Sequence, residues 1–201
     1  MVMRRTAASA AVTRRRRAIL DAALWVFTQR GYQRASIEEI RERSGASIGS
    51  IYHHFGGKEQ LAAALYVDGL RDYQEQFVRV LRGGADAEAT VRAVVANHLL
   101  WVADNPRLAA YLLSSREAEV SRATDSELRG MNRAAIDATR EWIAEEVAAG
   151  ELRPMRTQLF YAVLIGPCQE FARQWLKRRD RAALDEALAL LPEAAWRAMR
   201  A

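Results

Sequence analysis

The chain has 201 residues, of which half are apolar and 27% are charged, and its formal net charge is +5. This length accommodates one large domain or two small ones. No apolar run reaches the roughly 18 residues that a membrane span needs, so no membrane partner is expected. The N-terminus is rich in arginine but lacks the apolar segment of a signal peptide, and a lone Cys168 excludes an internal disulfide framework. Together these features predict a cytoplasmic protein.

The positive charge is concentrated near the N-terminus. Residues 1–60 contain eleven Lys and Arg against five Asp and Glu, a net charge of +6, whereas residues 61–201 carry a net charge of −1. A basic segment of this kind is typical of a surface that binds nucleic acid. The alternative, a merely solvated basic tail, is less attractive because the same segment contains the motif described below.

Residues 1–12 lack hydrophobic periodicity and are expected to form a disordered arm. Four consecutive arginines, residues 14–17, follow near the start of a helix predicted at 13–30. Because cations at a helix N-terminus oppose the helix macrodipole, we interpret these arginines, together with Arg4 and Arg5, as an arm that seeks phosphate. The alternative is a contribution to solubility alone. The apolar face of this helix is predicted to comprise Ile19, Leu20, Ala23, Val26 and Phe27.

Residues 36–58 (SIEEIRERSGASIGSIYHHFGGK) contain two short helical patterns joined by a tight turn. Ser36 followed by Glu39 forms an S-x-x-E capping box, which begins the first helix. Gly45 supplies the left-handed residue that ends this helix, and Ser47 caps the next one. Two capped helices joined by a three-residue turn with a glycine form a helix-turn-helix, whose second helix can lie in the DNA major groove.

The second helix, predicted at about 48–55, has one apolar side and one small polar side. Ile51 and Phe55 are an i, i+4 apolar pair, which is expected to pack inward. The residues predicted to point away from that pair are Gly49, Ser50 and His53. No carboxylate occurs in residues 46–58, which favours close approach to a polyanion.

These residues resemble the TetR (tetracycline-repressor-like) family of transcriptional regulators. The resemblance is carried by AILDAALWVFTQRGYQRASIEEI and SGASIGSIYHHFGGKEQL, within residues 18–61, about a quarter of the chain. It implies an all-α protein with a three-helix, DNA-binding helix-turn-helix domain at residues 1–60. A larger helical domain at residues 61–201 would bind an effector and dimerise. The implied function is repression from a palindromic operator in double-stranded DNA, relieved by a small-molecule effector.

The resemblance also implies which residues contact DNA. The positions assigned to DNA are Ser36, Ser47, Ile48, Gly49, Ser50, Tyr52, His53 and Lys58. Lys58 begins the next helix, where its ammonium is expected to reach a phosphate. Ile48 lies nearer the apolar side of the helical wheel, although the first turn could present it to a thymine methyl.

The sequence departs from the family pattern at three positions in this motif. Arg41 and Ser44 stand where alanine is usual, and Ala46 stands where valine is usual. Arg41 either reaches the surface and meets phosphate or loosens the packing of the two helices. The residues themselves do not decide between these alternatives.

The remainder of the chain is predicted to be helical. The expected segments are 58–82, 86–103, 106–115, 125–149, 157–179 and 180 to the C-terminal region. Residues 116–124 are predicted to form a polar connector. Gly166-Pro167 is expected to kink the segment that contains it, because proline removes a backbone hydrogen bond.

The resemblance implies an effector pocket and a homodimer in the second domain. Aromatic and polar side chains suited to a largely apolar effector are His98, Trp101, Tyr111, Met131, Trp142, Phe160 and Gln169. Each of these aromatic residues taken singly is better explained as core. A homodimer is expected because one recognition helix reads too few base pairs to define a site. The predicted interface residues are Leu159, Val163, Gly166, Phe171, Leu184, Leu188 and Trp196, unless the last two segments are internal core.

No enzymatic activity, metal or cofactor is predicted. His53 and His54 are adjacent and diverge on a helix, and His98 has no Cys, Asp or Glu one turn away. P-loop and G-x-S-x-G motifs are absent from the sequence. The alternative function is a non-specific architectural protein that binds nucleic acid without effector control.

Overall fold

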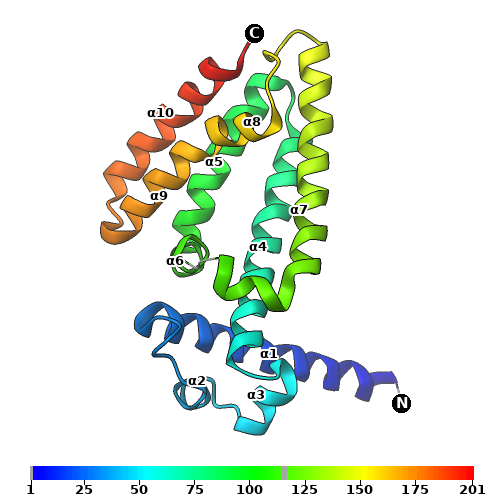
Figure 1. The fold of residues 1–201 in the computed structure, drawn as a ribbon, viewed down its shortest axis with the longest axis vertical. Coiled ribbons are helices and arrows are strands. Elements are labelled where there is room, and N and C mark those ends of the chain that lie inside the picture. The colour runs from blue at the N-terminus through cyan, green and yellow to red at the C-terminus, as the bar shows by residue number, and fades with distance from the viewer. Residues whose placement is uncertain (1, 115–116) are drawn as a thin grey trace. The chain divides into compact units, whose positions relative to one another are not determined.

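The computed structural model describes the backbone of residues 2–114 and 117–201 and the side chains of residues 12–114 and 128–201. Within these ranges the chain is mainly helical, with turns and loops between the helices (Figure 1). The helices, in chain order, are α1 (Val2–Arg30), α2 (Ile37–Ser44), α3 (Ile48–Phe55), α4 (Lys58–Gly83), α5 (Ala87–Asp104), α6 (Pro106–Ser114), α7 (Glu117–Ala148), α8 (Thr157–Leu164), α9 (Gly166–Arg178) and α10 (Arg181–Met199). No strand occurs in these ranges, where the extended backbone is limited to one isolated bridge between Leu152 and Arg200. The predicted all-α fold class is confirmed.

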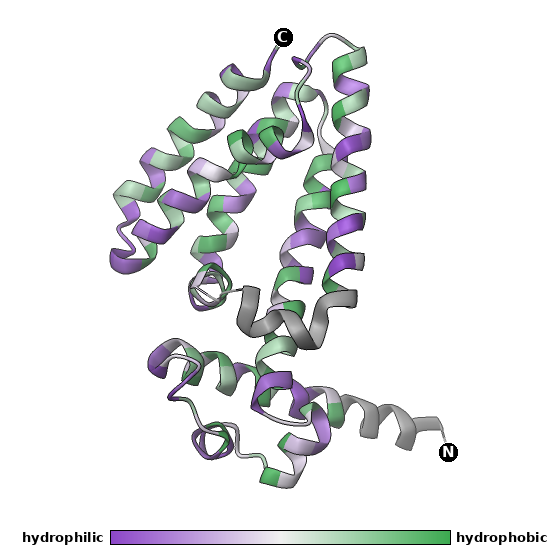
Figure 2. Cartoon of the chain, viewed as in Figure 1, coloured by the Kyte–Doolittle hydropathy of each residue, from purple (hydrophilic) through white to green (hydrophobic). Residues whose placement is uncertain are grey.

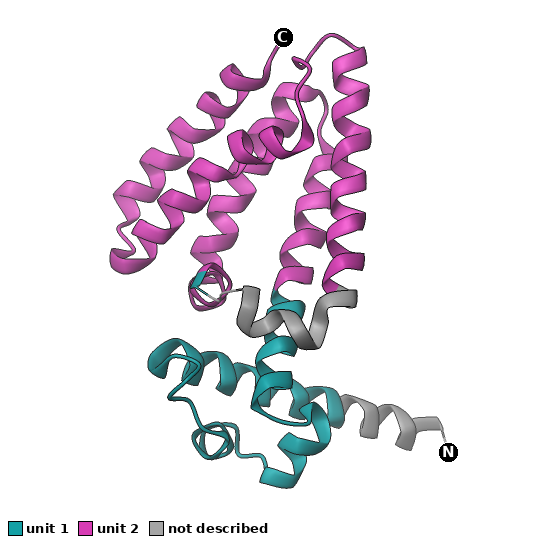
Figure 3. Cartoon of the chain, in the orientation of Figure 1, with its two compact units in different colours: residues 1–69, 114–125 teal, residues 70–113, 126–201 magenta. Residues whose placement is uncertain are grey.

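The chain divides into two compact units (Figure 3). Unit 1 comprises residues 1–69 and 114–125, and unit 2 comprises residues 70–113 and 126–201. The division within α4 therefore falls after Gly69, rather than at residue 60 as predicted from the sequence.

The core of unit 1 is built from the apolar faces of its first helices. The predicted face of α1 is buried, with Ile19, Ala23 and Val26 no more than 1% exposed. Ile40 of α2 and Ile51 of α3 are also fully buried, and α2 packs against both α1 and α3. Burial of each such side chain stabilises the fold by about 1.5–3 kcal/mol relative to leaving it exposed.

Two predicted helix boundaries are wrong. α1 begins at Val2 rather than near residue 13, so the backbone of residues 2–12 is helical instead of disordered. α7 begins at Glu117, which removes most of the connector predicted at residues 116–124. Neither stretch contains Gly or Pro, and alanine, a strong helix former, recurs in the first. The missing periodicity of residues 1–12 and the polar character of residues 116–124 were therefore poor guides.

The core of unit 2 is organised around α5, whose packing partners include α9 and α10. In Figure 2, apolar and polar segments alternate along α9 and α10, as expected for helices that bury one face. The segment predicted at 157–179 is broken at Ile165 into α8 and α9, with Pro167 in the first turn of α9. The predicted interruption at Gly166-Pro167 is therefore confirmed.

The structure corrects part of the predicted dimer interface. Leu184 and Trp196 of α10 are 2% and 9% exposed, because α10 lays its apolar face on α5 of the same chain. Phe171 and Leu188 are half-buried against the same core, as is Val163. Leu159 is 57% exposed. The alternative of an internal core helix thus applies to much of α10.

A buried histidine lies in the core of unit 2. The Tyr73 hydroxyl and His98 Nδ1 are 2.7 Å apart, and the Tyr73 ring stands edge-on to His98 and Trp101. Trp101 in turn donates from its indole nitrogen to Asp72 over 3.2 Å. Because burial penalises the charged imidazolium, the pKa of His98 is lowered from 6.5 to about 4.

This depressed pKa predicts a loss of stability in acid. The unfolded chain takes up the His98 proton below about pH 6.5, whereas the folded chain takes it up only near pH 4. The stabilisation is therefore complete above pH 6.5 and lost progressively below it. Between pH 7.5 and pH 5 we expect the free energy of unfolding to fall by about 2 kcal/mol more in the wild type than in His98→Gln.

Urea unfolding at one protein concentration, followed by circular dichroism at both pH values, measures this difference. The matched control is His53→Gln, which removes an exposed histidine and should keep the wild-type pH dependence. Equal acid losses in the wild type and His98→Gln would show that His98 is not the titrating group.

Candidate nucleic-acid interface

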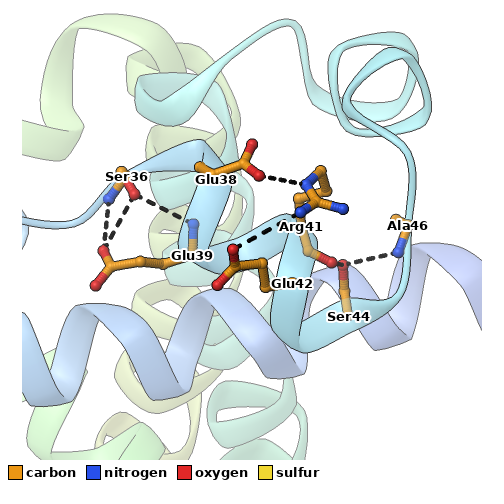
Figure 4. Close-up of polar contacts among 7 residues, drawn as sticks. All are labelled: Ser36, Glu38, Glu39, Arg41, Glu42, Ser44 and Ala46. Carbon is orange, nitrogen blue, oxygen red and sulfur yellow. Dashed lines mark hydrogen bonds and ion pairs between the residues drawn. The ribbon is translucent and has the colours of Figure 1, made fainter.

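The start of α2 is fixed by reciprocal hydrogen bonds around Ser36 (Figure 4). The Ser36 hydroxyl accepts from the backbone N–H of Glu39 over 3.2 Å, and the Glu39 carboxylate accepts from the Ser36 N–H over 3.1 Å. Glu38 and Glu39 also place negative charge in the first turn, where it complements the helix dipole. The predicted capping box is confirmed.

The turn between α2 and α3 depends on a left-handed glycine. Gly45 ends α2 with φ 64° and donates its N–H to the Arg41 carbonyl over 3.0 Å. The Ser44 hydroxyl accepts from the Ala46 N–H over 3.2 Å, which ties the end of the helix to the turn (Figure 4). Ser47 then begins α3 by accepting from the Ser50 N–H over 3.1 Å.

Arg41 is held by carboxylates of its own helix. Its guanidinium lies 2.6 Å from Glu38 and 3.7 Å from Glu42, and its side chain is 38% exposed (Figure 4). Arg41 therefore reaches the surface, and its charge is balanced by α2 itself. Ser44 is a second departure from the family pattern, and its hydroxyl forms a hydrogen bond within the turn.

α3 has the two faces that its sequence predicts. Ile51 and Phe55 are buried, at 0% and 8% exposed. The residues on the remaining surface that are exposed are Ser47, Ile48, Gly49, Tyr52 and His53, with Ser50 half-buried. Ile48 is 45% exposed and Tyr52 is 51% exposed, so the wheel-based placement of Ile48 nearer the core is wrong. α3 itself has no acidic side chain. Ser36, also assigned to DNA, is exposed at the start of α2.

The four consecutive arginines of α1, residues 14–17, divide into two pairs. Arg15 donates to the Gly45 carbonyl over 3.0 Å, so it braces the turn before α3. Arg16 lies 2.7 Å from the Asp68 carboxylate and 5.5 Å from the centroid of the Phe55 ring. Arg14 and Arg17 are exposed and form no ion pair with the described residues. The side chains of residues 4 and 5, also assigned to the phosphate-seeking arm, lie outside the described residues.

Trp25 contacts an arginine of α2. The Arg43 guanidinium lies over the indole, 3.8 Å from the ring centroid, in a cation–π arrangement. Trp25 is not among the residues predicted for the apolar face of α1, and the helical pattern gave no sign of this partner. Arg43 is eighteen residues away in the sequence.

Lys58 lies at the start of α4 and binds the loop between α1 and α2. Its ammonium is 3.2 Å from the Tyr32 carbonyl, 3.5 Å from that of Gln33 and 3.0 Å from that of Ala35. It also lies 4.8 Å from the centroid of the Tyr32 ring. All three ammonium protons therefore have carbonyl partners, whereas the sequence predicted that this group faces a phosphate.

We expect Lys58→Met to weaken the fold more than the electrostatics of DNA binding. Loss of the ammonium leaves the three carbonyls without their charged donor, which costs about 1–3 kcal/mol of unfolding free energy. The slope of log binding constant against log salt should not change. The exposed cation Arg14 provides the contrast, because Arg14→Gln should flatten the slope by about 0.9 if Arg14 meets one phosphate.

Urea unfolding and fluorescence anisotropy with labelled duplex DNA, over a series of salt concentrations, measure the two quantities. Both variants are compared at a temperature at which circular dichroism shows them folded. A slope that flattens by about 0.9 in Lys58→Met would assign Lys58 to phosphate instead.

Comparison with known proteins identifies this region. Residues 19–65 match the family described as bacterial regulatory proteins, tetR family. The chain is 32% identical over 81 residues to the HTH-type transcriptional repressor KstR2 of Rhodococcus jostii, a match that spans 40% of each chain. It is 22% identical over 162 residues to the fatty acid metabolism regulator protein of Bacillus subtilis, covering 79% of this chain and 81% of that one.

Solved structures extend the likeness to the whole fold. The transcriptional regulator FadR from Bacillus subtilis, in complex with stearoyl-CoA, matches with a TM-score of 0.69 at 20% identity, over 88% of this chain and 97% of that one. At this identity the likeness establishes the fold alone. Residues 19–65, which include the capped helix-turn-helix, thus match the tetR family of bacterial regulatory proteins.

Proposed function

We propose that the protein regulates transcription by placing α3 in the major groove of an operator. The observation that carries this assignment is the outer face of α3, which is exposed, free of carboxylates and held by a side-chain cap and a left-handed glycine. The net charge of +6 in residues 1–60 supplies the attraction to phosphate. Because the DNA of a bacterium lies in the cytoplasm, we place the protein there. Separately, none of the described helices is long and apolar enough to cross a membrane.

Repression under the control of an effector is the form of regulation that the relatives favour. KstR2 is named a transcriptional repressor, and the FadR structure contains stearoyl-CoA. We therefore infer that this chain represses its target and that a small molecule bound in unit 2 weakens its hold on DNA. We assign no catalytic activity to it, because the relatives named above are transcription regulators.

A non-specific architectural role is the alternative. Such proteins bind the backbone and the deformability of DNA with no base-specific contacts, and often insert apolar wedges into the minor groove. The described part of unit 1 instead presents a helix of the length and polarity that reads base edges in the major groove. Sequence-specific regulation is therefore the stronger assignment.

The assignment predicts discrimination among DNA sequences. The protein should bind a palindrome from the DNA beside its own gene at least about 1000-fold more tightly than a scrambled duplex at physiological salt. Ser50→Ala should reduce the difference in binding free energy between the two duplexes by about 1–3 kcal/mol. Its affinity for the scrambled duplex should be unchanged. Removal of Tyr52, expected to contact phosphate, should weaken both duplexes alike.

Fluorescence anisotropy at fixed salt measures all of these affinities. Gln33→Ala, at an exposed position between α1 and α2, is the control and should leave the ratio unchanged. Equal affinity for the palindrome and the scrambled duplex would favour the architectural alternative.

We further propose a homodimer that uses α8, because two recognition helices are needed for a two-fold site. Leu159 of α8 and Leu190 of α10 are 57% and 60% exposed, the largest exposed fractions among the hydrophobic side chains described. Val163 and Gly166 lie near Leu159 in sequence and are half-buried. Leu184 and Trp196 are omitted from the proposed interface because they are buried in the core of their own chain.

Leu159→Glu should convert the dimer into a monomer of 22.6 kDa in sedimentation at micromolar concentration and should reduce operator affinity. A charge at this exposed site meets no packed core in the single chain, so the helical content should be unchanged. Leu100→Glu, at a leucine of α5 that is 43% exposed, is the matched control and should remain dimeric. A wild-type monomer that binds a palindrome with one protein per site would contradict the dimer.

A further inference from the structure

A groove lies between α4 and α7 within unit 2. Its volume is about 740 Å³, within the range of small-molecule sites. The lining side chains and glycine come from one face of each helix, spaced three or four residues apart: Arg71, Gln74, Glu75, Val78, Arg79, Arg82 and Gly83 on α4, and Met131, Ala134, Ala135 and Ala138 on α7.

Small side chains on α7 keep this space open. Ala134, Ala135 and Ala138 line it where larger residues would fill the gap between the two helices. A hydrogen bond of 2.7 Å from Gln74 to Asn132 spans the same helices and helps to hold them at this separation.

The lining combines apolar side chains with an excess of positive charge. Val78, Met131 and the alanines are apolar, and the lining has three arginines but one carboxylate, that of Glu75. Arg71 and Arg82 are about 16 Å apart along α4, so the groove is elongated. An occupant that complements it has an extended apolar body and a negatively charged group.

Arg79 is the best placed of the arginines to bind the negative group. It is exposed and forms no ion pair with a carboxylate of the described residues. Arg71 already interacts with another group of the protein, so its charge is less available to a ligand. Arg82 also borders a smaller cleft whose wall carries Glu141, Glu145 and Glu146, which compete for its charge.

We propose that this groove binds an amphipathic anion, an apolar chain ending in a carboxylate or a phosphate, and that this ligand is the effector. Its head group pairs with Arg79, and its chain lies along Val78, Met131 and Ala134. The effector role depends on the proposed regulatory function, whereas binding in the groove does not. The site differs from the aromatic pocket predicted from sequence, with which it shares Met131 alone. Most of the other predicted residues are buried core, including His98, Trp101, Tyr111, Trp142 and Phe160.

Isothermal titration of the full-length protein without DNA tests the chemistry of the ligand. The probes are laurate, dodecyl phosphate and dodecyltrimethylammonium, each below its critical micelle concentration, and dodecanol below its solubility limit. We expect saturable binding of at least one anion, about tenfold weaker binding of dodecanol and no binding of the cation. The two anion arms distinguish a carboxylate ligand from a phosphate ligand. Equal binding of dodecanol and both anions, or no saturable binding of either anion, would overturn the proposed ligand class.

Two variants test the location. Arg79→Gln should weaken the bound anion about tenfold without changing the affinity for dodecanol. Ala134→Trp places an indole in the groove at an exposed position, so it should abolish binding of both compounds while the protein stays folded. Arg133→Gln, which removes an exposed arginine of α7 outside the groove, is the control and should bind as the wild type does. Unchanged anion binding in Arg79→Gln and Ala134→Trp would overturn the site.

Operator binding with and without the bound anion tests the effector role. We expect the ligand to weaken the operator complex by about 5–150-fold, and operator to weaken the ligand by the same factor. Anion binding that requires Arg79 but leaves operator affinity unchanged would overturn the effector role and leave the DNA-binding function intact. Failure to bind any operator would instead refute the proposed function, independently of the titrations.

Discussion

The left-handed backbone of Gly45 sets the direction in which α3 leaves the turn, and every exposed residue of α3 depends on it. A residue with a side chain would pay about 1–2 kcal/mol in this conformation, although the space around Gly45 is open. The conformation is supported from two sides. Arg15 of α1 holds the Gly45 carbonyl, and the Ser44 hydroxyl holds the N–H of the next residue. The turn thus links three helices through hydrogen bonds between side chains and its backbone.

Features of unit 1 that depend on a few neighbouring residues could be predicted from sequence. The capping box at Ser36, the glycine that ends α2 and the inward pair of Ile51 and Phe55 each involve residues within four positions of one another. The partners of Arg15 and Lys58 lie 23–30 residues away. A cation near a DNA-binding motif looks the same in sequence whether it meets a phosphate or a carbonyl.

In unit 2, too, contacts between residues far apart in the sequence could not be predicted. The apolar stripe of α10 was evident, but an amphipathic pattern does not say which surface covers it, and α5 of the same chain covers much of it. The groove between α4 and α7 arises from alanines, which give no signal in a search for aromatic or polar lining residues. The residues predicted to line a pocket were mostly large aromatic side chains. Such side chains bury a large apolar area, and most of them lie in the core.

The contact between Arg43 and Trp25 gives the helix-turn-helix unit its own optical reporter. Trp25 is the only tryptophan in residues 1–69 and 114–125, and it is half-buried beneath the guanidinium. The other four tryptophans belong to unit 2, and each is no more than 9% exposed. An aqueous quencher such as iodide should therefore reach Trp25 first, with the nearby guanidinium attracting the anion. The quenchable part of the emission would then follow unit 1 separately from unit 2 in the unlabelled protein.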